Sequence, residues 1–374
     1  MATQPAPAAT GMRVDEIDTP ALIVELDAFE YNLRAMAEAA QAAGMRMRPN
    51  AKTHKCAEIA KRQVALGAVG VCCQKVAEAE AMVDGGIADV LITNEVVGAA
   101  KVRRIATLAK RARIGVCVDH PLQVDQLALA AADAGAEIAV YVELDVGGNR
   151  CGVSAPKEAV ALVRQIGAHP ALHFAGLQAY HGRAQHLREP DERSRAVAHA
   201  QRAVNECLAA FVAAGIGCER ITGAGTGTYM LESGSGVWNE LQVGSYVFMD
   251  ADYGRNRLAP AAIRFRHSLF VLATVMSVSD GRLVLDAGLK AYSVDSGLPQ
   301  APDAPGWQFA RAADEHGVLT PASSAPPLPV EIGTKLRLIP GHCDPTVNLY
   351  DWLVAVRGGI VEAVWPVDGR GALS

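Results

Sequence analysis

Residues 114–144, IGVCVDHPLQVDQLALAAADAGAEIAVYVEL, contain a unit that recurs along much of the chain. Ile114–Val118 and Ile138–Leu144 are continuous apolar runs, as expected of strands that are covered on both faces. Between them, Pro121–Ala134 carries apolar residues three and four positions apart, which predicts a helix. This stretch therefore predicts a strand–helix–strand unit with parallel strands.

The same alternation continues on both sides of this unit. The other apolar runs that predict strands are Gly44–Arg48, Val69–Cys73, Val90–Thr93, Phe174–Tyr180, Arg220–Gly223 and Leu241–Phe248. The other helical patterns are Cys56–Leu66, Val76–Asp84, Ala99–Arg111, Lys157–Ile166 and Arg193–Ala214. Strands that alternate with helices in this way predict an α/β fold of the (β/α)8 TIM-like barrel type. A doubly wound open sheet is the alternative, because alternation alone does not prove closure.

The pattern changes near Arg255, and the helical periodicity ends after Leu258. Short β-rich segments follow, namely His267–Ser277, Arg282–Leu285, Lys335–Ile339, Trp352–Arg357 and Ile360–Trp365. They predict a second, mainly antiparallel β domain. We expect the barrel over residues 24–258, the β domain over 12–23 plus 259–374, and a loose tail over 1–11. Ala21–Leu26 could lead into the barrel or add a strand to the β domain.

Composition excludes several classes of protein. The net charge is −5, and the basic residues are scattered, so we expect no nucleic-acid partner. No apolar stretch is long enough to span a bilayer, and the N-terminus does not resemble a signal peptide. The eight cysteines form no C-x-x-C pair, which favours reduced thiols. A cytoplasmic protein without membrane contact is the prediction.

Chemically active side chains follow several predicted strands. In a barrel the active site lies at the carboxyl ends of the strands. Lys52 follows the first strand, Arg150 follows the fifth, Tyr180 to His186 follow the sixth, and Thr222 to Thr228 follow the seventh. These groups would therefore share one rim of the barrel.

The glycine-rich turn Thr222–Thr228 suits a phosphate, because small residues let backbone N–H groups approach an anion. A tight turn without a ligand is the plain alternative. Lys52 suits an imine-forming amine, since a lysine at a partly dehydrated barrel mouth is expected to have a lowered pKa. On spacing alone, Lys55 and Lys75 compete with Lys52 for this role.

Near the C-terminus, the segment Pro340–Thr346 contains His342 and Asp344 two residues apart. If the segment is extended, both side chains point to one side and Cys343 points to the other. A histidine and a carboxylate make half of a site for Mn²⁺, Zn²⁺ or Mg²⁺, with water or a third ligand completing it.

Taken together, these residues resemble the fold-type III (alanine racemase-like) pyridoxal-phosphate enzymes, and within them the D-threonine aldolase and 3-hydroxy-D-aspartate aldolase group. The matching stretches in the first half are Arg48-Pro-Asn-Ala-Lys-Thr-His-Lys55, Gly70-Val-Cys-Cys-Gln-Lys-Val76, Thr93-Asn-Glu-Val96, Gly147-Gly-Asn-Arg-Cys-Gly152 and Gly176-Leu-Gln-Ala-Tyr-His-Gly182. Those in the second half are Thr222-Gly-Ala-Gly-Thr-Gly227, Glu240-Leu-Gln-Val-Gly-Ser-Tyr246, Asp286-Ala-Gly-Leu-Lys290, Asp314-Glu-His-Gly317 and Gly341-His-Cys-Asp-Pro-Thr346. The resemblance runs from about Asp18 to the C-terminus.

The resemblance implies specific roles. Lys52 rather than Lys55 or Lys75 would carry the cofactor, and His186 would be the general base. The residues implied to contact pyridoxal 5'-phosphate are Lys52, Gln74, Arg150, Tyr180, Thr222, Gly223, Gly225, Thr226 and Tyr246. His342 and Asp344 would bind a divalent metal, with Mn²⁺ expected and Mg²⁺, Co²⁺ and Zn²⁺ as alternatives. A homodimer with active sites at the subunit interface is also implied.

The function implied is a metal-dependent aldolase (an aldehyde-lyase). It would cleave D-β-hydroxy-α-amino acids such as D-threonine or D-3-hydroxyaspartate to glycine and an aldehyde, by retro-aldol Cα–Cβ cleavage. The 3-hydroxyaspartate substrate is favoured, and Arg183, Arg255 and Arg257 are candidates for its second carboxylate.

Three alternatives stay open. A metal-dependent dehydratase acting on D-serine or 3-hydroxyaspartate shares the fold and the cofactor, although dehydratases tend to pair histidine with cysteine where this chain has Asp344. An amino-acid racemase would not need the metal. A non-catalytic pyridoxal-phosphate-binding protein would leave the β domain with its His342 and Asp344 unexplained.

Two positions depart from the family pattern. The family commonly has a histidine two residues before the lysine, where this chain has Asn50, so any role of that histidine is in doubt here. Ala224 replaces a glycine of the phosphate turn, which is a mild change if its φ is negative.

Overall fold

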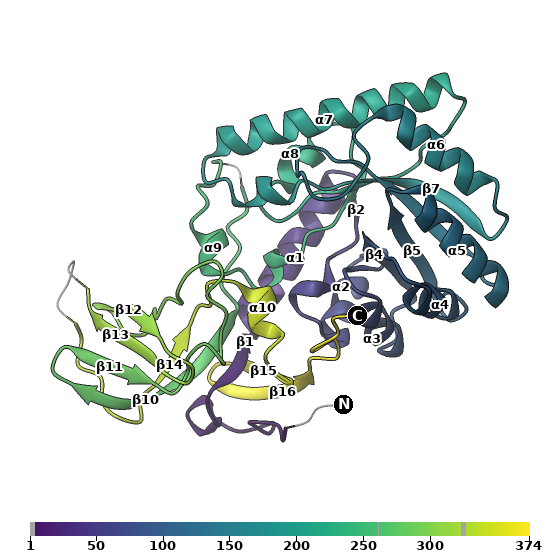
Figure 1. Ribbon diagram of the computed structural model, residues 1–374. Helices are drawn as coiled ribbons and strands as arrows, with labels where there is room; N and C mark the ends of the chain where they lie inside the picture. The colour runs from purple at the N-terminus through teal and green to yellow at the C-terminus, as the bar shows by residue number, and fades with distance from the viewer. Residues whose placement is uncertain (1–3, 261, 323–326) are drawn as a thin grey trace.

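The computed structural model describes residues 4–260, 262–322 and 327–374. It contains two large sheets, one parallel and one mainly antiparallel (Figure 1). The parallel sheet consists of β2 (Arg46–Met47), β3 (Val71–Cys73), β4 (Asp89–Glu95), β5 (Arg113–Val118), β6 (Ile138–Glu143), β7 (Leu172–Ala179), β8 (Ile221–Gly223) and β9 (Glu240–Leu241). Its strand order is β2-β9-β8-β7-β6-β5-β4-β3, so neighbours in the sheet follow one another in the chain, except that β2 pairs with β9, the last strand of the layer.

The parallel sheet curls until its two ends meet. Asn50 forms a parallel bridge with Cys72. Next to it, the N–H of Val69 donates to the Met47 carbonyl at 2.9 Å, and the N–H of Cys72 donates to the Pro49 carbonyl at 2.8 Å. This order confirms the barrel-like prediction, because a doubly wound sheet would reverse its order at a switch point.

Helices follow most of the strands and cover one face of the parallel sheet (Figure 1). They are α1 (Leu26–Ala42), α2 (Ala57–Ala65), α3 (Val76–Asp84), α4 (Ala99–Leu108), α5 (Pro121–Ala134), α6 (Pro156–Gly167), α7 (Pro190–Ala213) and α8 (Tyr229–Ser233). Buried residues such as Val116 and Val118 pack with the helices in one large cluster. Cys117, which lies between them in β5, belongs to a separate small cluster on the opposite face with Tyr141.

Within this layer one helix was not predicted and one predicted strand was wrong. Helix α1 was not predicted. The expected strand Leu241–Phe248 ends at Leu241 and continues as irregular chain and the short 3-10 helix η4, Ser245–Val247. The segment is apolar because it is buried rather than because it is a strand, and an apolar run alone does not distinguish the two.

The second sheet joins the C-terminal segments to one early strand. Its order is β12-β13-β11-β10-β1-β15-β16, and β14 also pairs with β10. The bounds are β1 (Ala21–Glu25), β10 (Leu269–Ser279), β11 (Arg282–Leu285), β12 (Trp307–Ala312), β13 (Gly317–Pro321), β14 (Lys335–Leu338), β15 (Trp352–Arg357) and β16 (Ile360–Pro366). β1 lies antiparallel to β10 and parallel to β15, so Ala21–Glu25 adds a strand to this sheet, and Leu26 begins α1.

The N-terminal segment is better held than predicted. Within residues 4–11, the Gly11 N–H donates to the Val361 carbonyl at 2.9 Å, and the Gln4 carbonyl accepts from Trp352 Nε1 at 3.0 Å. These contacts differ from the expected loose tail, because β15 and β16 offer hydrogen-bond partners. Residues 1–3 lie outside the described part of the chain. All eight cysteines are free thiols.

Two short helices lie where the sheets meet, α9 (Ala251–Gly254) and α10 (Cys343–Val347) (Figure 1). The Ala251 N–H donates to the Pro340 carbonyl at 3.0 Å, and the Cys343 N–H donates to Asp250 Oδ2 at 3.1 Å. These bonds bring the segment after the last parallel strand against the segment that contains His342 and Asp344. In the described ranges, no helix is long and apolar enough to cross a membrane.

Candidate active site

Lys52 lies in a short 3-10 helix, η2 (Ala51–Thr53), that follows β2. The Asn50 side chain caps this helix by accepting a hydrogen bond from the Lys52 N–H at 3.2 Å. Lys52 Nζ lies 3.2 Å from Asp344 Oδ2. Its rival Lys55 is buried in an ion pair with Glu78 at 2.6 Å. The surroundings of the two amines therefore favour Lys52 over Lys55 as the imine-forming lysine.

The pKa of Lys52 differs from the sequence expectation. The attraction of Asp344 raises it above its usual range and outweighs the burial that would lower it. Dehydration alone predicts a lowered pKa, but the partner carboxylate that reverses the shift comes from a distant part of the chain.

A polar pocket surrounds Lys52 at the carboxyl ends of the parallel strands. Its lining is Asn50, Lys52, Gln74, Thr93, Arg150, Gln178, Tyr180, Gly225, Thr226, Gln242, Gly244, Ser245 and Tyr253. A neighbouring outer pocket shares Lys52, Arg150 and Tyr180 with it and adds Arg183 and His186. The two pockets together bring six of the predicted cofactor residues and the predicted base to one place.

The glycine-rich turn contributes Gly225 and Thr226 to the inner pocket. In the described structure, neither backbone N–H has a hydrogen-bond partner. A Cβ atom at Gly225 would come within 2.5 Å of Gln185 Oε1, so only glycine fits there without a shift. Two free N–H groups in a tight turn suit a phosphate. Alanine in place of glycine at position 224 was expected to be a mild change only if its φ is negative. The φ of Ala224 is +64°, so this condition is not met.

Thr222, Gly223 and Tyr246 lie behind the pocket wall. Thr222 is buried, and its Oγ1 accepts from Gln242 Nε2 at 2.8 Å. A Cβ at Gly223 would meet the Ala179 carbonyl at 2.2 Å. The hydroxyl of Tyr246 accepts from Gln63 Nε2 at 3.0 Å, away from the pocket, while its N–H donates to Thr226 Oγ1 at 2.9 Å. These three residues support the turn and do not line the pocket.

Arg150, Tyr180 and Gln74 do line the inner pocket. The Arg150 guanidinium carbon lies 5.9 Å from the centre of the Tyr180 ring. Burial raises the pKa of Tyr180, so its hydroxyl stays protonated. Gln74 donates from Nε2 to Thr93 Oγ1 at 2.7 Å.

His342 and Asp344 are not in an extended segment. His342 is the residue before α10, and Asp344 lies inside this helix. Asp344 Oδ1 is buried and has no hydrogen-bond partner in the described structure. Burial alone would raise the Asp344 pKa, but Lys52 and His342 outweigh it and lower the pKa. His342 Nδ1 lies 2.8 Å from Asp295 Oδ2.

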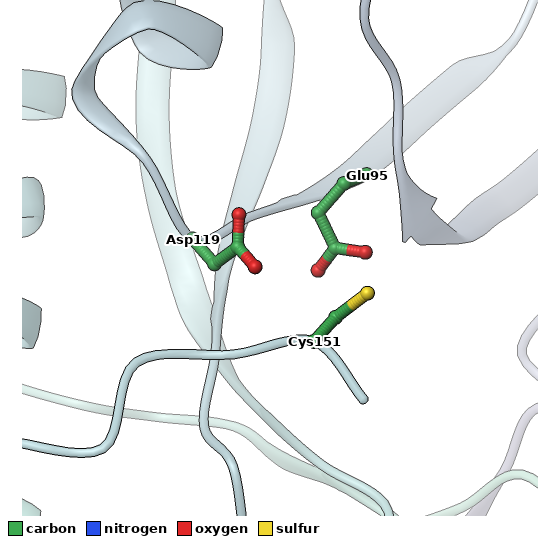
Figure 2. A group of neighbouring side chains, drawn as sticks. All are labelled: Glu95, Asp119 and Cys151. Carbon is green, nitrogen blue, oxygen red and sulfur yellow. The ribbon is translucent and has the colours of Figure 1, made fainter. Parts of the chain in front are cut away.

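A cluster of acidic groups lies beside Arg150. Figure 2 shows Glu95, Asp119 and Cys151, each of which places one carboxylate oxygen or its sulfur atom within 4.8 Å of the others. Glu143 is also buried, 3.6 Å from Arg150 Nη2, and its Oε2 has no hydrogen-bond partner within the described ranges. Burial, followed by the negative charge of Glu95, raises the Glu143 pKa to about 8. A protonated Glu143 relieves the repulsion in this cluster.

The three arginines suggested for a second carboxylate differ in their partners. Arg255 donates to Asp252 Oδ1 at 2.5 Å, and Arg257 lies 3.1 Å from Glu189. Arg183 lines the outer pocket and has no carboxylate partner in the described structure.

Sequence reasoning missed several residues of the site. Gln178 and Gln242, which both line the inner pocket, hydrogen bond to each other at 3.1 Å and 2.6 Å. Tyr253 packs on His186 with ring centres 5.4 Å apart, and Asp252 bonds to the same histidine. Gln178 lies near the carboxyl end of the predicted strand Phe174–Tyr180 and could have been found. Asp252 and Tyr253 follow the segment that was wrongly assigned as a strand.

Comparisons with known proteins agree with this arrangement. The family model for the alanine racemase N-terminal domain matches residues 24–252, and the model for a putative serine dehydratase domain matches residues 268–356. A D-threonine aldolase from Arthrobacter is 47% identical over 98% of this chain and 96% of its own length. A 3-hydroxy-D-aspartate aldolase from Paracoccus denitrificans is 46% identical over 98% and 95%.

A solved structure and a more distant relative complete the comparison. The crystal structure of D-threonine aldolase from Filomicrobium marinum superposes with a TM-score of 0.95 at 50% identity, covering 99% of this chain and 100% of the other. A D-threo-3-hydroxyaspartate dehydratase from Delftia is only 30% identical, over 88% of this chain and 92% of its own length. The identity therefore favours the aldolases over the dehydratase.

Proposed function

Because the chain belongs to the D-threonine aldolase and 3-hydroxy-D-aspartate aldolase group of the alanine racemase-like family, we propose that it cleaves D-β-hydroxy-α-amino acids to glycine and an aldehyde. One observation carries this proposal beyond the family. Lys52 from the parallel layer and Asp344 from the C-terminal region meet at 3.2 Å beside a polar pocket. A cofactor amine and a metal-binding carboxylate at one place suit cleavage of a bond next to a hydroxyl.

Pyridoxal phosphate is the cofactor expected of this family, and the pocket fits it. Lys52 offers the amine, the free N–H groups of Gly225 and Thr226 suit the phosphate, and Arg150 and Tyr180 would flank the ring. When bound, this group supplies an electron sink for the bond that breaks. The protein would orient the scissile bond and exclude water from it.

A divalent metal fits at His342 and Asp344. The buried Oδ1 of Asp344 lacks a partner in the described structure, as expected of a carboxylate oxygen that a cation would satisfy. Asp295 would orient the His342 ring through Nδ1, as carboxylates commonly do for metal-binding histidines. Such an ion would lower the pKa of a hydroxyl group. Nitrogen and carboxylate ligands suit several metals, and we propose Mn²⁺.

His186 is proposed as the general base. It lies on the outer pocket with Lys52, where a side chain can take the proton of the substrate's β-hydroxyl. We also propose a cytoplasmic homodimer with active sites at the interface, which analytical ultracentrifugation and subunit-mixing of inactive variants would test.

The first experiment is product analysis by mass spectrometry. The purified protein, supplied with pyridoxal phosphate and Mn²⁺, is given D-threonine or D-3-hydroxyaspartate, with an EDTA control for each. Glycine with acetaldehyde or glyoxylate, lost with EDTA, is the expected result. A keto acid with ammonia would instead identify a dehydratase, and an unaltered cofactor absorbance with every D-amino acid would indicate a non-catalytic binding protein.

Among these substrates we propose D-3-hydroxyaspartate. Arg183 supports this choice, since it is the arginine of the three candidates that lines the outer pocket without a carboxylate partner in the described structure. In an Arg183→Ala variant, kcat/KM for D-3-hydroxyaspartate should then fall by roughly 10-fold, because a charged hydrogen bond is lost. The value of kcat/KM for D-threonine should stay unchanged. Equal losses for both substrates would contradict this assignment.

A further inference from the structure

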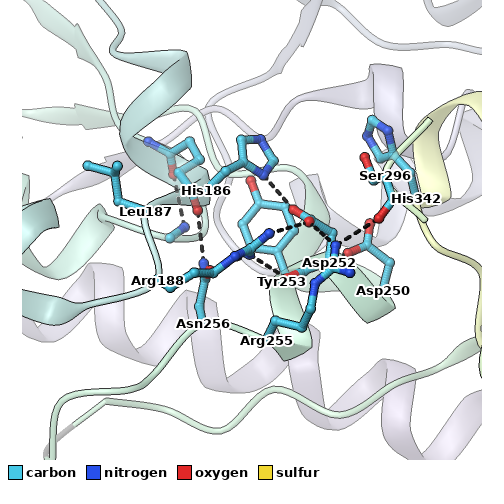
Figure 3. A network of polar contacts seen from close by, with 12 residues as sticks. His186, Leu187, Arg188, Asp250, Asp252, Tyr253, Arg255, Asn256, Ser296 and His342 are labelled. Carbon is cyan, nitrogen blue, oxygen red and sulfur yellow. Dashed lines mark hydrogen bonds and ion pairs between the residues drawn. The ribbon is translucent and has the colours of Figure 1, made fainter.

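The proposed base His186 is held by a network of buried and charged groups (Figure 3). Its Nδ1 lies 2.6 Å from Asp252 Oδ2. The other oxygen, Asp252 Oδ1, accepts from Arg188 Nη2 and from Arg255 Nη2, each at 2.5 Å. Asp252 is 5% exposed. Both oxygens of this carboxylate are therefore engaged, and each has a different kind of partner.

The two arginines are fixed in turn. Arg188 Nη1 donates to the Asp252 carbonyl and to Asn256 Oδ1, each at 2.7 Å. Arg255 Nη2 donates to the Ser296 carbonyl at 2.7 Å. The orientation of the Asp252 carboxylate is thus set from several sides, and it cannot turn without breaking charged hydrogen bonds.

The protonation of the pair follows from these contacts. Burial would raise the Asp252 pKa, but hydrogen bonds from Arg188, Arg255 and His186 outweigh it and lower the pKa to about 2. An ionised carboxylate only accepts hydrogen bonds, so Nδ1 of His186 must be the donor. When the ring is neutral, Nε2 then carries the lone pair. Nε2 has no partner among the described residues, and His186 lines the outer pocket.

Helix α9, which contains Asp252, also contacts the segment that leads to the proposed metal ligand His342. The N–H groups of Ala251 and Asp252 donate to the carbonyls of Pro340 and Gly341, at 3.0 Å and 3.3 Å. Gly341 directly precedes His342. Helix α9 thus sets the position of His186 relative to the proposed metal ligands.

We propose that Asp252, oriented by Arg188 and Arg255, is a positioning residue that keeps Nδ1 of His186 protonated and leaves Nε2 free to accept the proton of the substrate's β-hydroxyl. The inference rests on the proposed function. The proton passes from the hydroxyl oxygen to Nε2, Nδ1 keeps its own proton, and Asp252 balances the positive charge that forms on the ring.

Asp252→Asn is the sharpest test, because it keeps the size of the side chain. The two arginines can only donate, so the amide oxygen must stay toward them, and the amide NH₂ must face Nδ1 of His186. Nδ1 then has to accept, and the ring proton moves to Nε2, where it blocks the base. We expect kcat to fall by about 10²- to 10⁴-fold with KM nearly unchanged. Asp252→Glu should restore part of the rate.

The tautomer itself is measured by ¹⁵N NMR of histidine-labelled protein, with the His186 signal assigned from a His186→Gln variant. We expect the Nδ1-protonated ring in the wild-type protein and the Nε2-protonated ring in Asp252→Asn. The matched control is Asp303→Asn, which removes another aspartate paired with an arginine, Arg337 at 2.8 Å, and neither residue lines the inner or the outer pocket. It should keep the wild-type kcat and tautomer.

The outcomes separate this inference from the proposed function. Absence of glycine release by the wild-type protein would remove the aldolase proposal, while the NMR signal would still report on Asp252. An Asp252→Asn variant with the wild-type tautomer, or with the wild-type kcat in an active enzyme, would overturn the positioning role. Loss of rate with an unchanged tautomer would also overturn it, since that result indicates a structural effect.

Discussion

At the scale of single residues, the environment of each ionisable group determines its part in the site. Lys52 is favoured over its neighbour because Lys55 is occupied by Glu78 in a buried ion pair. Lys75 is exposed at the start of α3 and does not line the pocket. Three lysines that look alike in sequence thus differ in what surrounds them.

The proposed role of Lys52 as the cofactor lysine is tested by substitution. Lys52→Ala should abolish the covalent attachment of pyridoxal phosphate, because no other described lysine lines the pocket. The bound cofactor's visible absorbance, and its retention after borohydride reduction and denaturation, report on this attachment. Lys75→Ala is the control and should keep both signals. A reduced, cofactor-bearing Lys52→Ala chain would show that another amine carries the cofactor.

Glu143 predicts a dependence of stability on pH in the cofactor-free protein. Its folded pKa is raised to about 8, so between its unfolded pKa and pH 8 the folded state holds a proton that the unfolded state lacks. The free energy of unfolding should therefore fall as pH rises through this window, by at most about 1.4 kcal/mol per pH unit. Glu143→Gln should remove this slope, whereas Glu137→Gln, at an exposed glutamate, should retain it. Urea unfolding at several pH values measures the free energy of unfolding of both variants. If this free energy depends on pH equally in the wild type and in Glu143→Gln, the assignment is refuted.

At the scale of secondary-structure elements, buried charges join the strands that close the parallel sheet. Arg48, which follows β2, donates from Nε to Glu240 Oε1 of β9 at 3.0 Å and from Nη1 to Asp89 Oδ1 of β4 at 2.5 Å. Arg48 is 2% exposed and Glu240 is fully buried. These bonds connect β2 and β9, at one end of the curled parallel sheet, with β4, near its other end.

Arg48→Ala should destabilise the protein by about 3–5 kcal/mol, because it leaves the buried carboxylate of Glu240 without its main partner. Arg113→Ala is the matched control. Arg113 lies 3.2 Å from the same Asp89, but its side chain is 81% exposed, so its loss should cost about 0–1 kcal/mol. Denaturant unfolding measures the free energy of unfolding of both variants, and the m-value should stay unchanged. Similar small losses would mean that the buried pair is not needed for stability.

At the scale of the whole molecule, the site forms where the two sheets meet. Lys52, the glycine-rich turn and His186 come from the parallel layer, whereas His342 and Asp344 come from the segment between β14 and β15. A ligand that binds both sides would therefore hold the two parts together.

Metal binding should stabilise the whole protein. At about 100 times its Kd, Mn²⁺ is expected to add about 2.7 kcal/mol to the free energy of unfolding and to raise Tm, and EDTA should reverse the shift. His342→Ala should abolish the effect, while His173→Ala, an exposed histidine in β7 at the opposite end of the barrel, should keep it. Differential scanning calorimetry measures the shift. A full shift in His342→Ala would place the metal elsewhere.

The periodicity of the sequence by itself determined the parallel layer, because buried strands and amphipathic helices each leave a pattern within a few residues. It also determined that Lys52, Arg150, Tyr180 and the turn at Thr222–Thr228 share a rim, since the carboxyl ends of neighbouring parallel strands always lie together. The strands β12 and β13 were missed because they are partly exposed, so they carry little continuous apolar pattern.

Only the tertiary structure decided which groups touch across the two sheets. The contact of Lys52 with Asp344, which raises the lysine's pKa, joins residues far apart in the chain. The bond of His186 to Asp252 likewise depends on how α9 packs against the segment that precedes His342. Local patterns do not encode such contacts, because the packing of one layer on another sets them, and the protonation of a buried group follows from its neighbours in space.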